Sequence, residues 1–208
     1  MIINLPKLVT DYLNKFEYKR YFLNHKPYNL FNNIIVVPAI AEHDNIVNLI
    51  KSLKTNKTKT NNTLVIFVIN NLVTSTTDIK EENYKTIEYL NQVCLEKNDS
   101  FNISFVDAST EGNELPEKDG GVGLARKVGM DIALNYFDYE QNTLLVCLDA
   151  DCEVSENYFD VLDRYRIKGI DAGYVPFTHR FTNNEEENLA IICYDIFLHY
   201  YVAGLKFA

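Results

Sequence analysis

Four short apolar runs, each rich in β-branched residues, recur along the chain from residue 33 onward. They are predicted to be strands, at residues 33–39, 63–70, 101–108 and 143–150. The segments between and after them alternate polar and apolar positions with helical periodicity, at residues 42–54, 78–97, 122–137 and 155–167. Nearly continuous apolar strands separated by helices predict a parallel sheet covered on both faces, a Rossmann-like α/β architecture.

Both ends of the chain carry further patterns. Residues 5–22 place apolar side chains at helical spacing and have a basic polar side. We expect this amphipathic helix to pack against the main domain, and peripheral association with an anionic membrane is the alternative. Residues 172–181 are predicted to form a further strand, and residues 185–203 a final helix. The domain prediction is an N-terminal helical segment, residues 1–30, followed by a single α/β domain, residues 31–208.

Composition and charge narrow the class of protein. A chain of 208 residues with 47% hydrophobic residues and a net charge of −9 fits one sizeable soluble domain, and makes nucleic acid an improbable partner. Residues 1–60 carry a net +5, so the remainder carries −14. Four cysteines form no C-x-x-C pair and are interpreted as buried free thiols. With no signal-like leader and no apolar run of about 18 residues, we expect a cytoplasmic protein, with the inner face of the membrane as the alternative.

The first candidate site lies in the stretch LLVCLDADCEVSENYF, where a buried strand runs into carboxylates. Asp149 and Asp151 flank Ala150, and extended geometry would point both side chains to the same side. A hard divalent cation would relieve their repulsion. The alternative is that one Asp caps the following helix and the other is solvated. An EF-hand loop is disfavoured by Val154, where glycine is needed, and a haloacid-dehalogenase-type motif by Glu153.

A second candidate site is the glycine-rich stretch DGGVGLARKVGMDIAL, residues 119–134. Its glycines permit close approach of the backbone to a ligand, and the following helix would aim free N–H groups at an anion. Arg126 and Lys127 in its first turns indicate an anionic neighbour. The dinucleotide fingerprint G-x-G-x-x-G is not met. A plain glycine-rich connection with a solvated Arg126 is the alternative.

Taken in order, these motifs resemble glycosyltransferase family 2, whose members have the GT-A fold. VVPAIAEHD is similar to that family's V-I-P-x-Y-N-E, with Pro38 and Glu42 matching. DGGVGLARKVGMDIAL is similar to N-G-G-x-x-x-A-R-N-x-G-x-x-x-A, and LLVCLDADC to f-L-D-A-D-D. The resemblance covers about residues 33–165, and the order and spacing of three motifs make it more specific than any one of them.

The resemblance implies an enzyme that transfers a sugar from a nucleotide-sugar donor, a UDP- or GDP-sugar, to a saccharide or lipid-linked acceptor in polysaccharide biosynthesis, with inversion. Asp149 and Asp151 would bind Mn²⁺ or Mg²⁺, which bridges the donor diphosphate. The implied nucleotide-sugar-binding residues are Pro38, Ala39, Glu42, Asn70, Gly121, Arg126, Lys127, Asp149 and Ala150.

Departures from the family pattern leave alternatives open. Asn70 and Asn71 stand where D-D-x-S-x-D is usual, so the base is undetermined, and Lys127 replaces the usual Asn. No E-D motif supplies a general base after Asp151, and the catalytic base is unassigned, with Asp195 and His179 as chemically able candidates.

We therefore expect a donor-binding portion of a longer enzyme, or a form too short to turn over alone. A sugar nucleotidyltransferase and a non-catalytic nucleotide-sugar-binding module are the competing functions.

Overall fold

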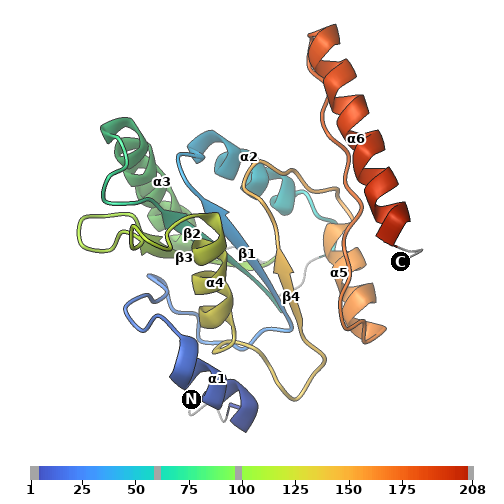
Figure 1. Cartoon of the computed structure of the whole chain (residues 1–208). Coiled ribbons are helices and arrows are strands. Elements are labelled where there is room, and N and C mark those ends of the chain that lie inside the picture. Colours follow the sequence, from blue (N-terminus) through green and yellow to red (C-terminus); the bar gives the residue numbers. More distant parts are fainter. Residues whose placement is uncertain (1–4, 59–61, 97–99, 206–208) are drawn as a thin grey trace. The chain divides into compact units, whose positions relative to one another are not determined.

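The computed structural model describes residues 5–58, 62–96 and 100–205 (Figure 1). The chain divides into two compact units, residues 1–170 and residues 171–208. The first unit contains, in chain order, α1 (Lys7–Phe16), β1 (Asn33–Ala39), α2 (His43–Lys54), β2 (Thr63–Asn70), α3 (Thr77–Leu95), β3 (Asn102–Ala108), α4 (Val122–Ala133), β4 (Leu144–Cys147) and α5 (Tyr158–Ile167). The second contains α6 (Glu185–Leu205).

The four strands form one parallel sheet in the order β3-β2-β1-β4, which confirms the predicted α/β architecture. β1 pairs with β2 along its whole length, from Asn33 opposite Thr63 to Ala39 opposite Ile69. On its other side β1 pairs with β4, from Asn33 opposite Leu144. Every residue of β1 and β2 is buried, which explains why these strands are continuous apolar runs in the sequence.

Helix α4 covers one face of the sheet, and its contact with β1 and β2 is close (Figure 1). A Cβ on Gly129 would lie 2.4 Å from Cγ1 of Val36 and 2.9 Å from Cγ2 of Val68. Glycine is therefore needed where the helix crosses the two central strands. The core on this side also includes Phe31, Ile34, Leu64, Ile66, Val106, Leu124, Ala125, Val128, Ile132 and Phe137.

Helix α1 ends at Phe16, six residues before the predicted end at residue 22. Glu17 adopts an extended conformation, with φ −69° and ψ 137°. The chain then places Tyr21 and Leu23 in the core beside the sheet, and the backbone N–H of Asn24 donates to the carbonyl of Phe105 on β3. The helix therefore ends early because the residues after it leave the helical path to pack into the core. Strand β4 likewise ends at Cys147, earlier than predicted.

The second unit consists of an irregular segment and α6. The final helix is confirmed, but the predicted strand at residues 172–181 is wrong, because these residues have no regular secondary structure. The described part of this unit contains no strand with which they could pair. Instead, the segment is bonded to α6 through Asn188, whose amide N–H₂ donates to the carbonyl of Thr182 and whose Oδ1 accepts from the Thr182 N–H.

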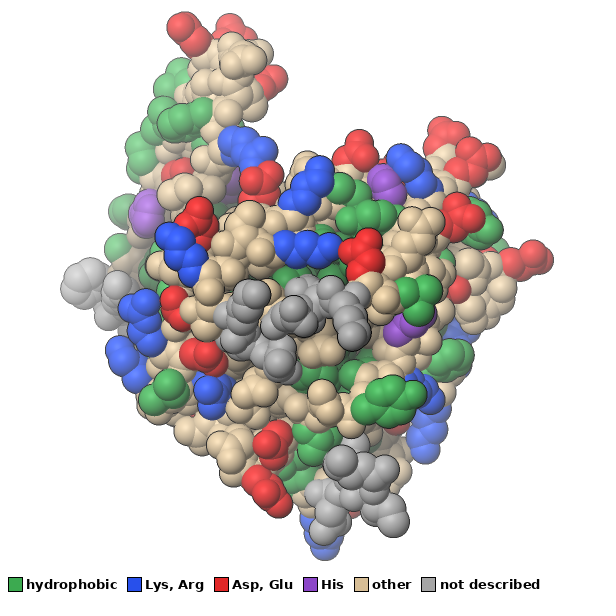
Figure 2. Space-filling model, turned by 180° about the vertical axis from the view of Figure 1, so that it is seen from behind, with side chains coloured by type: hydrophobic (Ala, Val, Ile, Leu, Met, Phe, Trp, Pro, Cys, Tyr) green, Lys and Arg blue, Asp and Glu red, His purple; other side chains and the backbone are tan. Residues whose placement is uncertain are grey.

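None of the helices in the described residues is long and apolar enough to cross a membrane. On the face shown in Figure 2, the described acidic and basic side chains are interspersed with apolar ones and do not gather into a continuous basic stripe. The cysteines are less buried than predicted, because Cys147 lies on the outer strand of the sheet and is exposed, as is Cys193 on α6.

Candidate functional site

The strand order places a topological switch point beside β1. The chain proceeds from β1 to β2 and β3 on one side, and β4 then joins the sheet on the other side. Ligands of open parallel sheets bind at such a point, at the carboxyl ends of the strands. A cavity of about 210 Å³ lies there, and its lining residues are Pro38, Ala39, Ile40, Glu42, Asn70, Val122, Asp149, Ala150 and Asp151. We call this cavity the switch-point pocket.

Most of the residues singled out in the sequence come together in this pocket. They are Pro38, Ala39, Glu42, Asn70, Asp149, Ala150 and Asp151, which derive from the ends of three strands. Gly121 directly precedes the lining residue Val122, and Arg126 contacts the lining residue Asp149. Sequence reasoning missed Ile40 and Val122. Their positions next to the predicted residues Ala39 and Gly121 could have indicated them. An apolar side chain in a loop, however, does not by its chemistry distinguish a binding residue from any other.

The turn after β1 is held in place by a buried asparagine on α3. Ala41 has a φ of +52°, in the left-handed region that a residue with a Cβ rarely adopts. Its N–H donates to Oδ1 of Asn83 at 2.9 Å. The Nδ2 of Asn83 donates in turn to the carbonyl of Asn70 at 3.0 Å and to Oδ1 of Asn71 at 2.8 Å. Asn83 is 2% exposed, so it ties the ends of β1 and β2 together in a buried network.

The side chain of Asn70 has a defined orientation. Its Nδ2 donates to the carbonyl of Ala39 at 2.8 Å and to that of Val68 at 3.3 Å. An amide group carries two N–H donors and one carbonyl acceptor. Because main-chain carbonyls take both donors, Asn70 offers Oδ1, a hydrogen-bond acceptor, to a ligand in the pocket.

The glycine pair before α4 is required by the local geometry. A Cβ on Gly120 would lie 2.2 Å from Cδ2 of Leu72 and 2.6 Å from the carbonyl oxygen of Pro116. Gly121 has a φ of +137° and occupies the N-cap position of α4. The first backbone N–H groups of a helix have no partner within it, and they favour an anion. The glycines therefore bring the start of α4, at Val122, to the wall of the pocket.

Arg126 and Asp149 form an ion pair at the site. Nη2 of Arg126 donates to Oδ1 of Asp149 at 2.7 Å, with the Asp149 side chain 64% exposed. Among the described residues, the buried Nε of Arg126 has no hydrogen-bond partner. Buried donors without a partner are uncommon and costly in proteins. Because this Nε is also closed off from the surface, the guanidinium must shift before Nε can donate to a ligand.

Lys127 does not line the pocket. Its ammonium is bonded to Asp131 one turn further along α4, and it donates to the carbonyl of Phe16 at 2.8 Å. The ammonium also lies 5.7 Å and 5.5 Å from the ring centroids of Tyr12 and Tyr18. The hydroxyl of Tyr12 donates to Asp131 at 3.0 Å. In this structure Lys127 thus fastens the N-terminal segment to α4, and its place beside the phosphates stays a prediction.

Asp149 and Asp151 both line the pocket, but they lie in a turn, in which the N–H of Cys152 donates to the carbonyl of Asp149 at 3.2 Å, and not in the extended strand that the sequence predicted. The described residues contain no group of three or more His, Cys, Asp or Glu side chains that could hold a metal ion. Two carboxylates on one pocket wall fit a hard cation only if a ligand supplies further oxygens.

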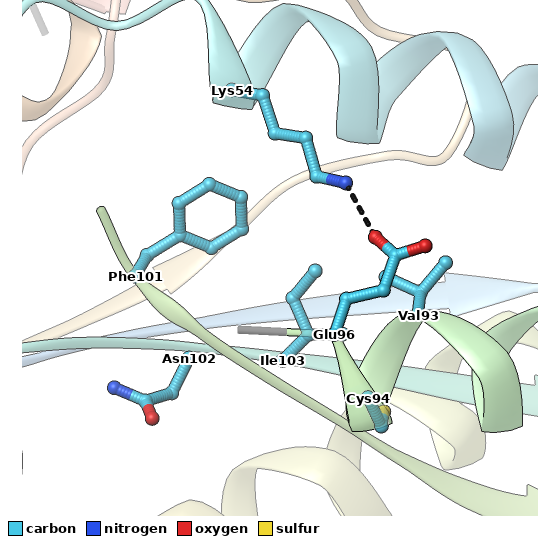
Figure 3. Close-up of a pocket in the computed structure, with 7 residues that line it drawn as sticks. All are labelled: Lys54, Val93, Cys94, Glu96, Phe101, Asn102 and Ile103. Carbon is cyan, nitrogen blue, oxygen red and sulfur yellow. Dashed lines mark hydrogen bonds and ion pairs between the residues drawn. The ribbon is translucent and has the colours of Figure 1, made fainter. Parts of the chain in front are cut away.

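A smaller cavity of about 70 Å³ lies at the opposite end of the strands, where β3 begins (Figure 3). An ion pair between Lys54 and Glu96 at 3.1 Å lies across it. Burial raises the pKa of its Cys94 thiol to about 12, so this group stays a protonated thiol at neutral pH. The arrangement has no activated group, and the switch-point pocket is the better candidate site.

Comparisons with known proteins give only a loose likeness. No protein-family model matches the chain, and no curated protein matches it. Among solved structures, residues 1–349 of S. aureus TarS in complex with UDP-GlcNAc share 14% identity with this chain, at a TM-score of 0.44. The same region of TarS in complex with UDP shares 16%, at a TM-score of 0.41. These alignments cover 71% of this chain and 38% and 39% of those chains, so the chain spans about two fifths of their length.

Proposed function

We propose that the chain binds a nucleoside diphosphate sugar in the switch-point pocket and forms part of a metal-dependent glycosyltransferase of the family 2 type. Such an enzyme would transfer the sugar, with inversion, to a hydroxyl of a saccharide or lipid-linked acceptor. The observation that carries this proposal is the meeting of three groups in one pocket: a fixed acceptor on Asn70, the start of α4, and the carboxylates of Asp149 and Asp151.

The nucleobase would bind toward the end of β2. Oδ1 of Asn70 can accept a ring N–H, because both N–H donors of its amide are already bonded to main-chain carbonyls. Uracil and guanine each carry such a ring N–H, and the amino groups of cytosine and adenine can also donate to this oxygen. The fixed amide is therefore compatible with the UDP- or GDP-sugar that the sequence resemblance implies, and it does not by itself select the base. Pro38, Ala39 and Glu42 would line the nucleotide pocket beside it.

The diphosphate would lie between the start of α4 and the carboxylates. Free N–H groups at the helix N-terminus are donors suited to phosphate oxygens, and the guanidinium of Arg126, which is paired with Asp149, would donate to them after a shift of its side chain. Asp149 and Asp151 would hold Mn²⁺ or Mg²⁺, with diphosphate oxygens completing the coordination. The cation would neutralise charge on the leaving nucleoside diphosphate. Because Asp149 is paired with Arg126, Asp151 is expected to be the more important ligand.

Calorimetric titration tests this proposal. UDP, GDP, CDP and common sugar conjugates of UDP and GDP are titrated into the chain, with and without Mn²⁺. We expect UDP or GDP to bind at least tenfold more tightly with Mn²⁺, a difference of about 1.4 kcal/mol. Asp151→Ala should remove that difference. Asp11→Ala, which deletes an exposed carboxylate on α1, is the matched control and should leave it intact. A well-folded sample that binds none of these ligands would refute the proposal.

A further inference from the structure

Helix α1 packs against the rest of the first unit along one side. Leu13 is the one residue of this helix that is buried. The hydroxyl of Tyr12 donates to Asp131, and the carbonyl of Phe16 accepts a hydrogen bond from Lys127, both on α4. These contacts place α1 at the edge of the unit, beside the second half of α4 (Figure 1). The other sides of the helix face solvent.

Large apolar side chains are exposed on α1 and on the segment after it. Leu8 is 82% exposed and Phe16 47%. Phe22 and Tyr28, which follow the helix, are 60% and 96% exposed. A single exposed apolar side chain is normal on a soluble protein, but a series of them within one stretch indicates a surface that binds a partner.

The same stretch is basic, although the chain as a whole is acidic. Residues 5–30 contain five Lys or Arg and two Asp or Glu, a net +3, so the rest of the chain carries −12. All five cations are exposed, and within the described ranges none of them forms an ion pair. They are Lys7, Lys15, Lys19, Arg20 and Lys26. An anionic surface would therefore attract this stretch and repel the rest of the chain.

Two of the lysines lie over exposed rings. Nζ of Lys15 is 4.9 Å from the ring centroid of Phe16, and Nζ of Lys26 is 6.0 Å from that of Phe22. At a bilayer surface, aromatic rings lie at the level of the headgroups, and a lysine beside them extends its ammonium toward water and phosphate. A protein partner would need a specific fit to these alternating apolar and basic groups. Anionic headgroups above acyl chains satisfy both kinds of group without one.

We propose that residues 5–30 bind the surface of an anionic lipid bilayer. Leu8, Phe16, Phe22 and Tyr28 enter the interfacial layer, and the basic side chains contact lipid phosphates. This binding is independent of the proposed function. Only its consequence rests on that function, namely that the chain meets a lipid-linked acceptor at the bilayer surface.

Co-sedimentation of the full chain with lipid vesicles tests the inference. One set of vesicles is pure phosphatidylcholine, and the other contains about 30 mol% phosphatidylglycerol. We expect the chain to bind the anionic vesicles at least tenfold more tightly than the neutral ones. Raising the ionic strength from about 0.1 M to 1 M, which shortens the Debye length from about 10 Å to 3 Å, should weaken this binding at least tenfold.

Charge reversal shows whether this surface or the net charge is responsible. The double substitution Lys15→Glu and Lys19→Glu should weaken binding to the anionic vesicles at least tenfold. The matched control is Lys85→Glu with Lys118→Glu, which changes the net charge equally at exposed lysines on α3 and before α4. It should weaken binding less than threefold.

A second pair of variants tests the apolar contribution. Phe22→Ser should weaken binding to the anionic vesicles at least fivefold. Tyr84→Ser, which removes a ring of similar exposure from α3, is the control and should leave it unchanged. The rings are 60% and 57% exposed, so neither substitution leaves a cavity in the core.

Three results would overturn the inference: no binding to either set of vesicles by a folded sample, equal binding to both sets, or equal losses in the two charge-reversal variants. Sedimentation equilibrium without lipid adds a fourth, because a dimer that Phe22→Ser dissociates would show that a second copy covers this surface. Nucleotide calorimetry of the same samples separates these failures from failure of the proposed function. Nucleotide binding without vesicle binding removes the membrane surface only, and vesicle binding without nucleotide binding keeps that surface.

Discussion

Replacing Asn83 by alanine should weaken the fold and the switch-point pocket together. The substitution deletes three buried hydrogen bonds, to Ala41, Asn70 and Asn71, at distances of 2.8 to 3.0 Å. At a net contribution of about 0.5–1.5 kcal/mol each, the loss is about 1.5–4.5 kcal/mol. The better helix propensity of alanine returns about 0.5 kcal/mol. We therefore expect the free energy of unfolding to fall by about 1–4 kcal/mol.

Urea unfolding followed by far-ultraviolet circular dichroism measures this loss, since the chain has no tryptophan to report by fluorescence. Asn91→Ala on the same helix is the control. It removes one partly buried bond, to Nε2 of His25 at 2.9 Å, and should cost about 1 kcal/mol or less. Because Ala41 loses its support at a positive φ, nucleotide affinity should also fall at least fivefold in Asn83→Ala alone. A loss of stability no larger than that of Asn91→Ala would refute the role assigned to this network.

Three further substitutions test other parts of the structure. Gly129→Ala should destabilise the chain by about 1–3 kcal/mol in urea unfolding, because its Cβ would overlap Val36 and Val68, whereas Gly123→Ala, with open space around it, should be neutral or stabilising. Lys127→Met should lower the free energy of unfolding by about 2–3 kcal/mol, which is below the range for fully buried ion pairs because Lys127 is 35% exposed. Nucleotide affinity, measured by calorimetry, should change less than twofold. A tenfold loss of affinity would instead show that Lys127 takes part in nucleotide binding. Burial alone would raise the pKa of Asp107, but hydrogen bonds from Thr110, Ser109 and Asn113 outweigh this effect, so the pKa is lowered. The ionised carboxylate therefore stabilises the fold at pH values above its unfolded pKa of about 3.9. This stabilisation is lost as the pH falls through the lower pKa of the folded state. Asp107→Asn should therefore be less stable at pH 7 and lose less stability between pH 5 and pH 2 than the unaltered chain, and identical pH profiles would contradict this account.

The sheet and the pocket were predictable from sequence because their signals are local. Strands buried on both faces must be apolar throughout, and parallel topology then brings every strand's carboxyl end to one edge. The amino-acid sequence alone therefore sufficed to place Asn70, Asp149 and Asp151 at the same edge of the sheet. The strand predicted at residues 172–181 failed because an apolar, aromatic run indicates a strand only if another strand lies beside it.

The orientation of side chains was less accessible. Arg126 and Lys127 are neighbours in the sequence, but successive side chains of a helix point about 100° apart, so only Arg126 contacts a residue that lines the pocket. Asn83 looked like any polar position on a helix surface. Its role depends on the turns after β1 and β2 meeting at α3, and no pattern within α3 records that contact.

The most direct test of the central claim is to locate the cation. Crystals of the chain grown with Mn²⁺ and UDP or GDP would be measured at the manganese absorption edge, and the anomalous signal would place the metal. The account predicts manganese bound to the carboxylate of Asp151 and to the nucleotide diphosphate, at the carboxyl ends of β1 and β4. Manganese and nucleotide bound together elsewhere on the chain would contradict it.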